Sequence, residues 1–239
     1  MAMSDPYLLL WLEAPLQSWG HDSRFGRRDT LDFPTRSGVL GLICCALGAG
    51  GEQRELLARL ASGEMTVEAY VSTDHDGNPQ PRPPLLRDFH MVGSGYDTED
   101  PWESLMVPKT AEGKKAVGAG TKMTYRYALQ DMAFAVALQV PDDLAENIGQ
   151  ALVAPTWDLY LGRKHCAPTE FIYQGQFGTA DDANERALEL AQTKQRAFSF
   201  RVLEGEHEGE VLTLNDVPIQ FGTDKRYRDR RVTVQDWQG

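Results

Sequence analysis

The residues Phe33 to Gly48, FPTRSGVLGLICCALG, constrain the fold of this chain most, because an apolar run opens directly behind a polar segment that contains glycine. We predict a helix here, in which Pro34 fixes the approach and Thr35 or Ser37 caps the first amides. Its apolar residues are too many for a helix that buries only one narrow stripe, so the helix should lie in the core. Gly48 then ends it.

Unpaired amides at the start of this helix, with Arg36 beside them, would suit a phosphate or a carboxylate. Gly38 removes side-chain bulk at the same point, so we expect Arg36, Ser37 and Gly38 to meet an anion. One alternative is a buried helix in which Gly38 and Gly41 only allow close packing. A second alternative is that Arg36 forms a buried structural ion pair.

The length of 239 residues favours one main domain with a smaller addition. The N-terminal segment MAMSDPYLLLWLEAPL lacks the basic region of a signal peptide, and no apolar run approaches the length of a membrane span, which predicts a cytoplasmic protein without a membrane partner. The three cysteines form neither an even disulfide set nor a CxxC pair, so we expect buried reduced thiols. No Cys/His cluster fits zinc and no glycine-rich nucleotide motif is present, so we expect no metal and no cofactor.

The formal net charge of -11 counts against a protein that holds nucleic acid by bulk electrostatics alone. The basic residues, however, gather in short clusters, and such separation permits a local basic groove on an acidic body. The clusters are Arg24, Arg27, Arg28 and Arg36; Lys109, Lys114, Lys115, Lys122 and Arg126; Arg163, Lys164 and His165; and Lys225, Arg226, Arg228, Arg230 and Arg231. Each cluster taken singly could equally be a solvated face.

The apolar pattern predicts an α+β fold with a ferredoxin-like βαββαβ order. Its strands are Tyr7 to Glu13, Met65 to Val71, Ala133 to Val140 and a final strand within Phe171 to Phe177. One helix is the anchor helix described above, and the second follows Pro141.

Leu85 to Val92 and Thr124 to Leu129 predict a hairpin, inserted at about 85–130 between the second and third strands. Its tip, Val92 to Lys122, has glycines, lysines and no periodicity, so it should be mobile unless a partner orders it. We divide the chain into a main domain, 1–178, and a small β-rich C-terminal subdomain, 179–239. The latter should begin with a helix capped by Thr179 and continue with strands in Phe198 to Leu203 and Val211 to Leu214.

Two loops carry candidate binding residues. The segment YLGRKHC, Tyr160 to Cys166, places Gly162 directly before Arg163, Lys164 and His165, which is a reasonable phosphate loop. The loop after the first strand contains Trp19, which could stack on a base or could equally pin the loop to the core.

Four motifs, in order, resemble the CasD family, the fifth Cas family, of type I-E CRISPR Cascade complexes. They are Gln17-Ser18-Trp19-Gly20; Phe33-Pro34-Thr35-Arg36-Ser37-Gly38; Leu86-Arg87-Asp88-Phe89-His90; and Tyr160-Leu161-Gly162-Arg163-Lys164-His165-Cys166-Ala167-Pro168-Thr169. The resemblance covers the chain to about Thr169, and FPTRSG followed by glycine-spaced leucines is its most specific part.

The resemblance implies an RRM-like fold whose thumb hairpin grips the 5′ handle of the CRISPR RNA and caps one end of an antiviral ribonucleoprotein. Its implied partners are the CRISPR RNA, the Cascade backbone and large subunits and, through the complex, target DNA. No catalysis is implied for this branch. A sister branch cleaves repeat RNA without metal, using tyrosine, lysine and histidine. His90 is present here, but Phe89 stands where that branch would have lysine.

Two main interpretations remain open, with a small-molecule-binding domain as a third. The first is a non-catalytic RNA-binding subunit, and the second is a metal-independent endoribonuclease with His90 and His165 as acid and base. We favour the first. The candidate RNA-binding residues are Trp19, Arg24, Arg27, Arg28, Arg36, Ser37, Gly38, Arg87, His90, Lys122, Arg126, Arg163, Lys164 and His165.

Overall fold

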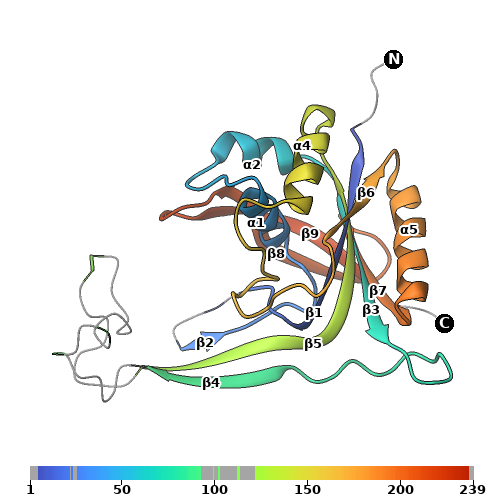
Figure 1. Cartoon of the computed structure of the whole chain (residues 1–239), viewed down its shortest axis with the longest axis horizontal. Coiled ribbons are helices and arrows are strands. Elements are labelled where there is room, and N and C mark those ends of the chain that lie inside the picture. The colour runs from blue at the N-terminus through green and yellow to red at the C-terminus, as the bar shows by residue number, and fades with distance from the viewer. Residues whose placement is uncertain are drawn as a thin grey trace.

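The computed structural model describes residues 5–21, 23, 26–92, 99, 102, 112–113 and 122–236, without the side chains of Val92 and Lys122. Over this part the chain is a mixed α/β protein built on one large antiparallel sheet (Figure 1). The predicted tip of the thumb, Val92 to Lys122, lies almost wholly outside the described residues, and so does Arg24.

The centre of the sheet has the predicted βαββαβ order, with one additional short helix. Strands β6-β1-β5-β3 lie side by side, and each is antiparallel to its neighbour. The elements in chain order are β1 (Tyr7–Gln17), β2 (Arg27–Arg28), α1 (Arg36–Ala46), α2 (Arg54–Leu60), β3 (Met65–Ser72), β4 (Leu86–Val92), β5 (Lys122–Gln139), α4 (Asp142–Val153) and β6 (Tyr173–Phe177).

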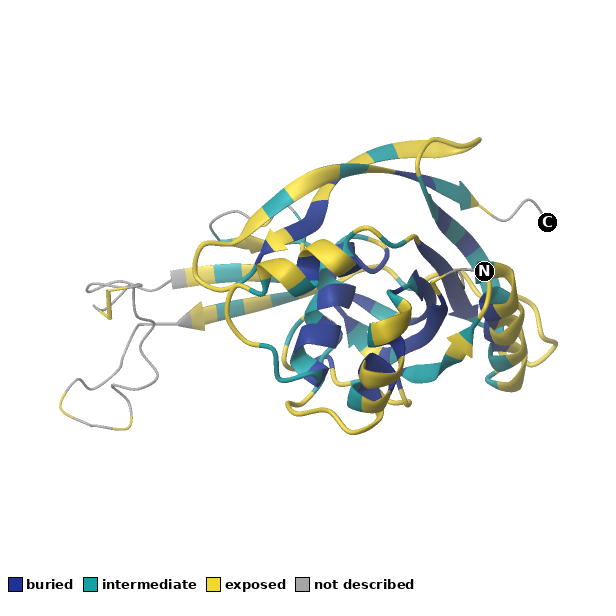
Figure 2. Cartoon of the chain, turned by 90° about the horizontal axis from the view of Figure 1, so that it is seen from above, coloured by how far each residue is buried: buried dark blue, intermediate teal, exposed yellow. Residues whose placement is uncertain are grey.

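Strand β1 is buried on both faces, as its continuous apolar run predicted. Leu8, Leu10 and Leu12 belong to the core cluster that includes α1 and α4. Leu9 and Trp11 belong to a second cluster, whose helical members come from α5 (Ala180–Thr193). Helices therefore cover both faces of the sheet, and the buried residues concentrate between them (Figures 1 and 2).

Strand β5 unites two segments that the sequence separated, Thr124 to Leu129 and Ala133 to Val140. Its second half pairs with β1 and β3 in the core, and its first half pairs with β4, where Leu86 faces Ala128. Asp131 lies between the halves and has a positive φ of 49°, which marks a local irregularity in the strand. The hairpin is thus a direct extension of the central strand.

The C-terminal residues extend the same sheet instead of forming a separate one. They comprise α5, β7 (Arg196–Glu204), β8 (Glu210–Gln220) and β9 (Arg226–Asp236). Strand β7 pairs with β3, and β9 lies between β7 and β8. The predicted strands appear within β7 and β8, and Thr179 caps α5 by accepting a hydrogen bond from the Asp182 amide, 3.1 Å away. The sequence missed β9.

The start of α1 is capped by groups of the chain itself. The Thr35 hydroxyl accepts a hydrogen bond from the Gly38 amide at 3.1 Å, and the Asp216 carboxylate on β8 accepts one from the Arg36 amide at 2.7 Å. The helix start does attract an anion, as its partial positive charge requires. The anion is a side chain of this protein, which corrects the expectation of a ligand on these amides.

The prediction that the Arg36 guanidinium meets a phosphate is wrong. The residue is only 1% exposed, it pairs with Glu204 at 2.8 Å, and it donates to the carbonyl of Gly63 at 2.8 Å. Burial lowers its pKa, and Glu204 opposes that shift. Arg230 pairs with Asp216 at 2.7 Å and approaches Glu204 at 3.4 Å, so two arginines and two carboxylates form one partly buried network.

The cysteines are free, and Cys44 and Cys166 are buried. Burial raises the pKa of the Cys44 thiol to about 11. A thiol of that pKa is almost entirely protonated near neutral pH, so Cys44 is a packing residue and not a nucleophile.

We expect Arg36→Ala to lower the free energy of unfolding by about 3 kcal/mol, because it removes a buried guanidinium and leaves Glu204 with only the longer contact to Arg230, at 3.4 Å. Urea unfolding measures this. The control is Arg59→Ala, whose ion pair with Asp143 is exposed to solvent and should contribute little to stability. An equal, small loss in both variants would contradict the structural role of Arg36.

Candidate nucleic-acid interface

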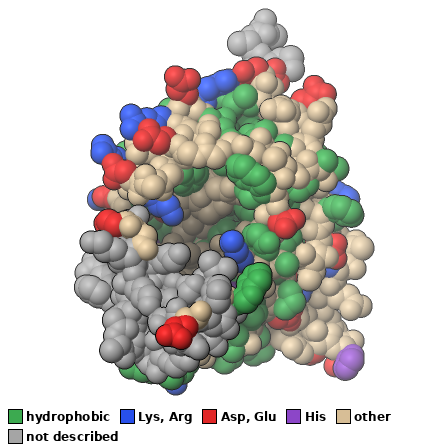
Figure 3. All heavy atoms as spheres, turned by 60° about the vertical axis from the view of Figure 1, so that its left-hand side comes forward, with side chains coloured by type: hydrophobic (Ala, Val, Ile, Leu, Met, Phe, Trp, Pro, Cys, Tyr) green, Lys and Arg blue, Asp and Glu red, His purple; other side chains and the backbone are tan. Residues whose placement is uncertain are grey.

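A groove of ≈ 520 Å³ runs across the side of the molecule where α1 begins. Its floor includes Ser37, Gly38 and Gly41 of α1. Arg28 and Arg163 also line the groove, the turn between β8 and β9 supplies Phe221 and Lys225, and the start of β9 supplies Tyr227. Figure 3 looks onto this side and shows it hollowed, with Lys and Arg side chains in the hollow. Motifs far apart in the sequence therefore meet here.

Trp19 borders this groove but does not offer its ring to a base. It is 1% exposed, and its indole nitrogen donates to the Gln17 side chain at 3.2 Å. A Cβ atom at Gly38 would lie 2.8 Å from the Trp19 ring, so Gly38 is needed for this packing. The stacking prediction is wrong for Trp19, and its role is the alternative one of pinning the loop.

The hairpin has a basic face next to the groove. Opposite residues in paired strands point to the same side. The register places Arg28 beside Arg126, and Asp88 opposite Arg126. His90 lies two residues beyond Asp88 on this face, and its imidazole contacts the Asp88 carboxylate. Cations of two strands thus line one side of the hairpin.

The other face of the hairpin is aromatic. Arg27 lies over the Tyr127 ring at 4.9 Å, and Arg87 lies over the Tyr125 ring at 5.6 Å. Phe89 packs on Tyr125 with ring centroids 5.2 Å apart. Phe89 and Tyr125 stay exposed, so this face offers ring and guanidinium surfaces to a partner.

Arg163 joins the loop Tyr160 to Cys166 to the hairpin. Its guanidinium donates to the carbonyls of Tyr127 at 3.0 Å and Arg28 at 2.8 Å. Burial lowers its pKa, and nearby Arg126 and Arg28 lower it further. Burial and the neighbouring arginines therefore destabilise the charged form of Arg163, and a bound anion would stabilise it.

Most arginines of the described residues are already paired with carboxylates, and those of the groove are not. The paired ones are Arg27, Arg36, Arg54, Arg59, Arg82, Arg186, Arg196, Arg201, Arg226, Arg230 and Arg231. Within the described part of the chain, no carboxylate forms an ion pair with seven cations: Arg28, Arg87, Arg126, Arg163, Arg228, Lys164 and Lys225. Three of these seven, Arg28, Arg163 and Lys225, line the groove, and Arg126 neighbours Arg28 in the sheet. Unpaired positive charge therefore gathers at and beside this groove.

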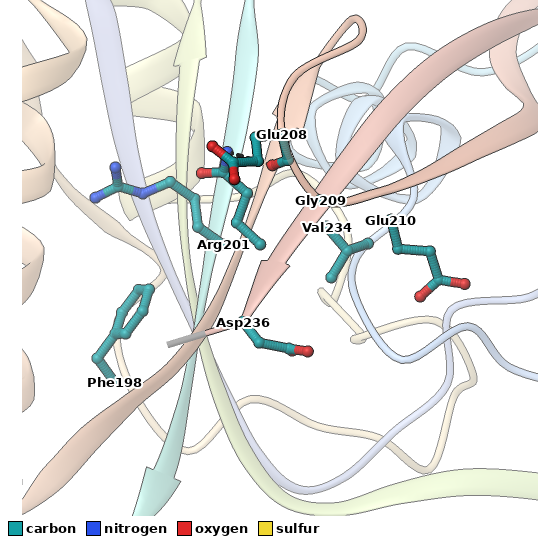
Figure 4. A pocket seen from close by; sticks show the side chains of 8 residues that line it. Phe198, Arg201, Glu208, Gly209, Glu210, Val234 and Asp236 are labelled. Atoms are coloured by element: carbon teal, nitrogen blue, oxygen red, sulfur yellow. Dashed lines mark hydrogen bonds between the residues drawn. The ribbon is translucent and has the colours of Figure 1, made fainter. Parts of the chain in front are cut away.

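A second hollow of ≈ 520 Å³ has the opposite character. It lies between β7 and the β8–β9 hairpin, and its lining includes Glu208, Glu210 and Asp236 (Figure 4). Its arginine, Arg201, is paired with Glu68. This hollow would repel a phosphate, so volume alone does not mark the interface.

The family model described as CRISPR-associated protein (Cas_Cas5) matches residues 7–233. This chain belongs to the Cas5 family. It is 30% identical over 232 residues to the CRISPR system Cascade subunit CasD of Escherichia coli (strain K12), a match that covers 92% of this chain and 94% of that protein.

Two solved structures are similar to this Cas5 protein. One, titled CRISPR RNA-guided surveillance complex, contains a chain with a TM-score of 0.69 and 29% identity over 96% of this chain and 89% of that one. The other, titled Crystal structure of Cas protein, has a TM-score of 0.60 and 27% identity over 97% and 94%. The family resemblance expected from the four motifs is therefore confirmed.

The Cas5 structure divides the predicted site residues into groups. The groove is lined by Arg28, Ser37, Gly38 and Arg163. Strand β2 and the hairpin carry Arg27, Arg87, His90 and Arg126. Lys164 and His165 are exposed but do not line the groove. Trp19 and Arg36 are core residues. Arg24 and the side chain of Lys122 lie outside the described residues.

Sequence reasoning did not assign Lys225 and Tyr227 to the site. The sequence shows Lys225 only as a member of the basic cluster Lys225 to Arg231, and the signal that would place both residues is a strand in that segment, β9.

No described helix is long and apolar enough to cross a membrane. Among the described residues, no group of His, Cys, Asp and Glu is arranged to hold a metal ion.

Gly162 positions Arg163, and replacing it should disturb the groove. Its φ is +98°, and an added Cβ would collide with the carbonyl of Ser18. We expect Gly162→Ala to cost about 1–3 kcal/mol of stability through backbone strain, or a drop in melting temperature of roughly 2–12 °C. The control is Gly178→Ala, where a Cβ meets nothing within 4 Å. Equal melting temperatures would contradict this role of Gly162.

Proposed function

We propose that this Cas5 protein is a non-catalytic subunit of a Cascade-type CRISPR RNA-guided complex that holds the 5′ handle of the CRISPR RNA. The observation that carries the proposal is the gathering of unpaired cations at one groove, while the other described arginines are mostly neutralised. A phosphate backbone is the ligand that such a set attracts most strongly.

The overall charge supports a groove that is selective for its own RNA. With a net charge of -11, most of the surface repels nucleic acid, and only a local basic region can bind it. Arg28, Arg126 and Arg163 supply that region. The acidic remainder would reject other RNA, which suits a subunit that sits inside a larger assembly.

The hairpin supplies what a single-stranded RNA needs besides charge. Unstacked bases pack on aromatic rings and on guanidinium planes, which Phe89, Tyr125 and Arg87 offer. In this proposal the thumb hairpin grips the handle, and the protein caps one end of the complex in the cytoplasm. Its partners would be the CRISPR RNA, the backbone and large subunits and, through them, target DNA, in antiviral defence.

A second candidate function is metal-independent cleavage of repeat RNA. It is favoured by the contact of the His90 imidazole with the Asp88 carboxylate on the basic face, because a carboxylate orients a histidine for proton transfer. His165 is the other candidate. No hydrogen bond joins His90 to His165, or either to a lysine or tyrosine, within the described residues. We therefore place this function second.

The binding proposal predicts that the purified chain, alone or with partner subunits, retains a discrete RNA. Arg126→Ala should weaken binding of a single-stranded RNA and reduce the log–log salt slope by about 0.7, because one phosphate contact is lost. Arg186→Ala is the control. It removes the same charge from α5, where Arg186 pairs with Glu189, and should leave the slope unchanged. An equal slope for Arg126→Ala and wild type would contradict the proposal.

The two candidate functions separate in one nuclease assay. Labelled repeat RNA is incubated in EDTA with wild type, His90→Ala and His165→Ala. We expect intact RNA in all three reactions, because no complete acid and base pair is assembled. A single specific cut by the wild type that disappears in His90→Ala would replace the proposed function with the second one.

A further inference from the structure

Gly41 is a glycine in the middle of α1 that packing does not explain. A Cβ atom there would meet nothing within 4 Å, whereas one at Gly38 would strike Trp19. Glycine in a helix interior destabilises the helix relative to alanine. Gly41 lies on the floor of the groove, so its missing side chain leaves room for a ligand to approach the helix backbone.

The turn between β8 and β9 stands over the same floor and is firmly held there. The Phe221 amide donates to the Glu52 carbonyl at 3.0 Å, and Arg54 donates to the Gln220 side chain at 2.8 Å. A Cβ at Gly222 would be in ordinary contact with Gly51, at 3.5 Å. The turn thus packs against the segment that leads into α2 and is hydrogen-bonded to it.

The turn presents one cation to the groove, and the start of β9 presents one aromatic ring. Lys225 is exposed and has no acidic partner among the described residues, whereas its neighbour Arg226 is paired with Asp224 at 2.7 Å. Tyr227 is half-buried, and burial raises its pKa, so the ring is a neutral surface at physiological pH. A cation beside a ring suits a phosphate and its base.

We propose that a single strand of RNA crosses α1 at Gly41, in the groove that is lined by Arg28 and Arg163 and also by Lys225 and Tyr227 of the C-terminal segment, which we call the second wall. Lys225 binds a phosphate, and Tyr227 contacts a base or ribose. The inference rests on the proposed function and adds a second wall to it, made by the C-terminal strands. The volume of ≈ 520 Å³ lies within the range of sites for small ligands, about 300–1,000 Å³, so the groove has room for individual nucleotides.

The test compares binding of fluorescein-labelled single-stranded RNA of mixed sequence, using the full chain and the complex assembled with its partner subunits. Gly41→Leu should fill the floor, keep or raise the melting temperature and weaken binding at least tenfold. Gly178→Leu, an equal change in open space away from the groove, should bind as the wild type does. Lys225→Ala should reduce the salt slope, unlike Arg186→Ala. Ultraviolet cross-linking should attach RNA to the peptide that contains Tyr227.

The outcomes distinguish this inference from the function on which it rests. If Arg126→Ala weakens binding while Gly41→Leu and Lys225→Ala bind normally, the second wall is refuted and the proposed function stands. If the wild type holds no RNA in either form, both are refuted. Should Gly41→Leu fail to fold, Lys225→Ala and the cross-link decide: a normal salt slope without a Tyr227 cross-link refutes the second wall.

Discussion

The structure depends on the charge network that joins α1 to the last three strands. Arg36 is buried, and a buried guanidinium is tolerated only where carboxylates and carbonyls meet it. Glu204 supplies its countercharge, and Asp216 caps the helix amide while it binds Arg230. The C-terminal strands therefore supply the carboxylates that neutralise Arg36 and cap the first helix. They also bring the β8–β9 turn to the groove, so the network fixes both the core and the shape of the proposed site.

Local patterns allowed most of the fold to be predicted. The apolar run of β1, the alternation in β3 and the amphipathic helix α4 each carry their own signal, and together they gave the βαββαβ order. Strand β9 carried no such signal, because Arg226, Arg228, Arg230 and Arg231 replace the apolar residues by which a strand is usually recognised. The unity of β5 was missed for a related reason, since Gln130 and Asp131 resemble a break in a strand that in fact continues.

The site was predictable as a set of motifs but not as a set of free charges. Arg36 lies close to a glycine at a helix start, and Arg163 follows a glycine in a loop. From the sequence alone, both residues are equally good candidates for binding a phosphate. They differ in their partners: Glu204 neutralises Arg36, whereas among the described residues Arg163 donates hydrogen bonds to backbone carbonyls and has no carboxylate partner. Those partners lie far away along the chain, and no local pattern reveals them. Trp19 shows the same limit, because only the fold decides whether a ring is covered.

The unbroken course of β5 ties the chemistry of the hairpin to the register of the core. Successive side chains of a strand alternate between faces, but the irregularity at Asp131 shifts this alternation, because Leu129 and Met132 both pack in the core cluster that includes α1. The spacing from Ala133 back to Met123, with this irregularity included, decides which face of the hairpin is basic and which is aromatic. Inserting or deleting one residue near Asp131 would exchange the two faces without changing the composition of the hairpin. Natural variation in hairpin length should therefore concentrate beyond the paired strands, while the spacing between core and hairpin changes, if at all, by even steps.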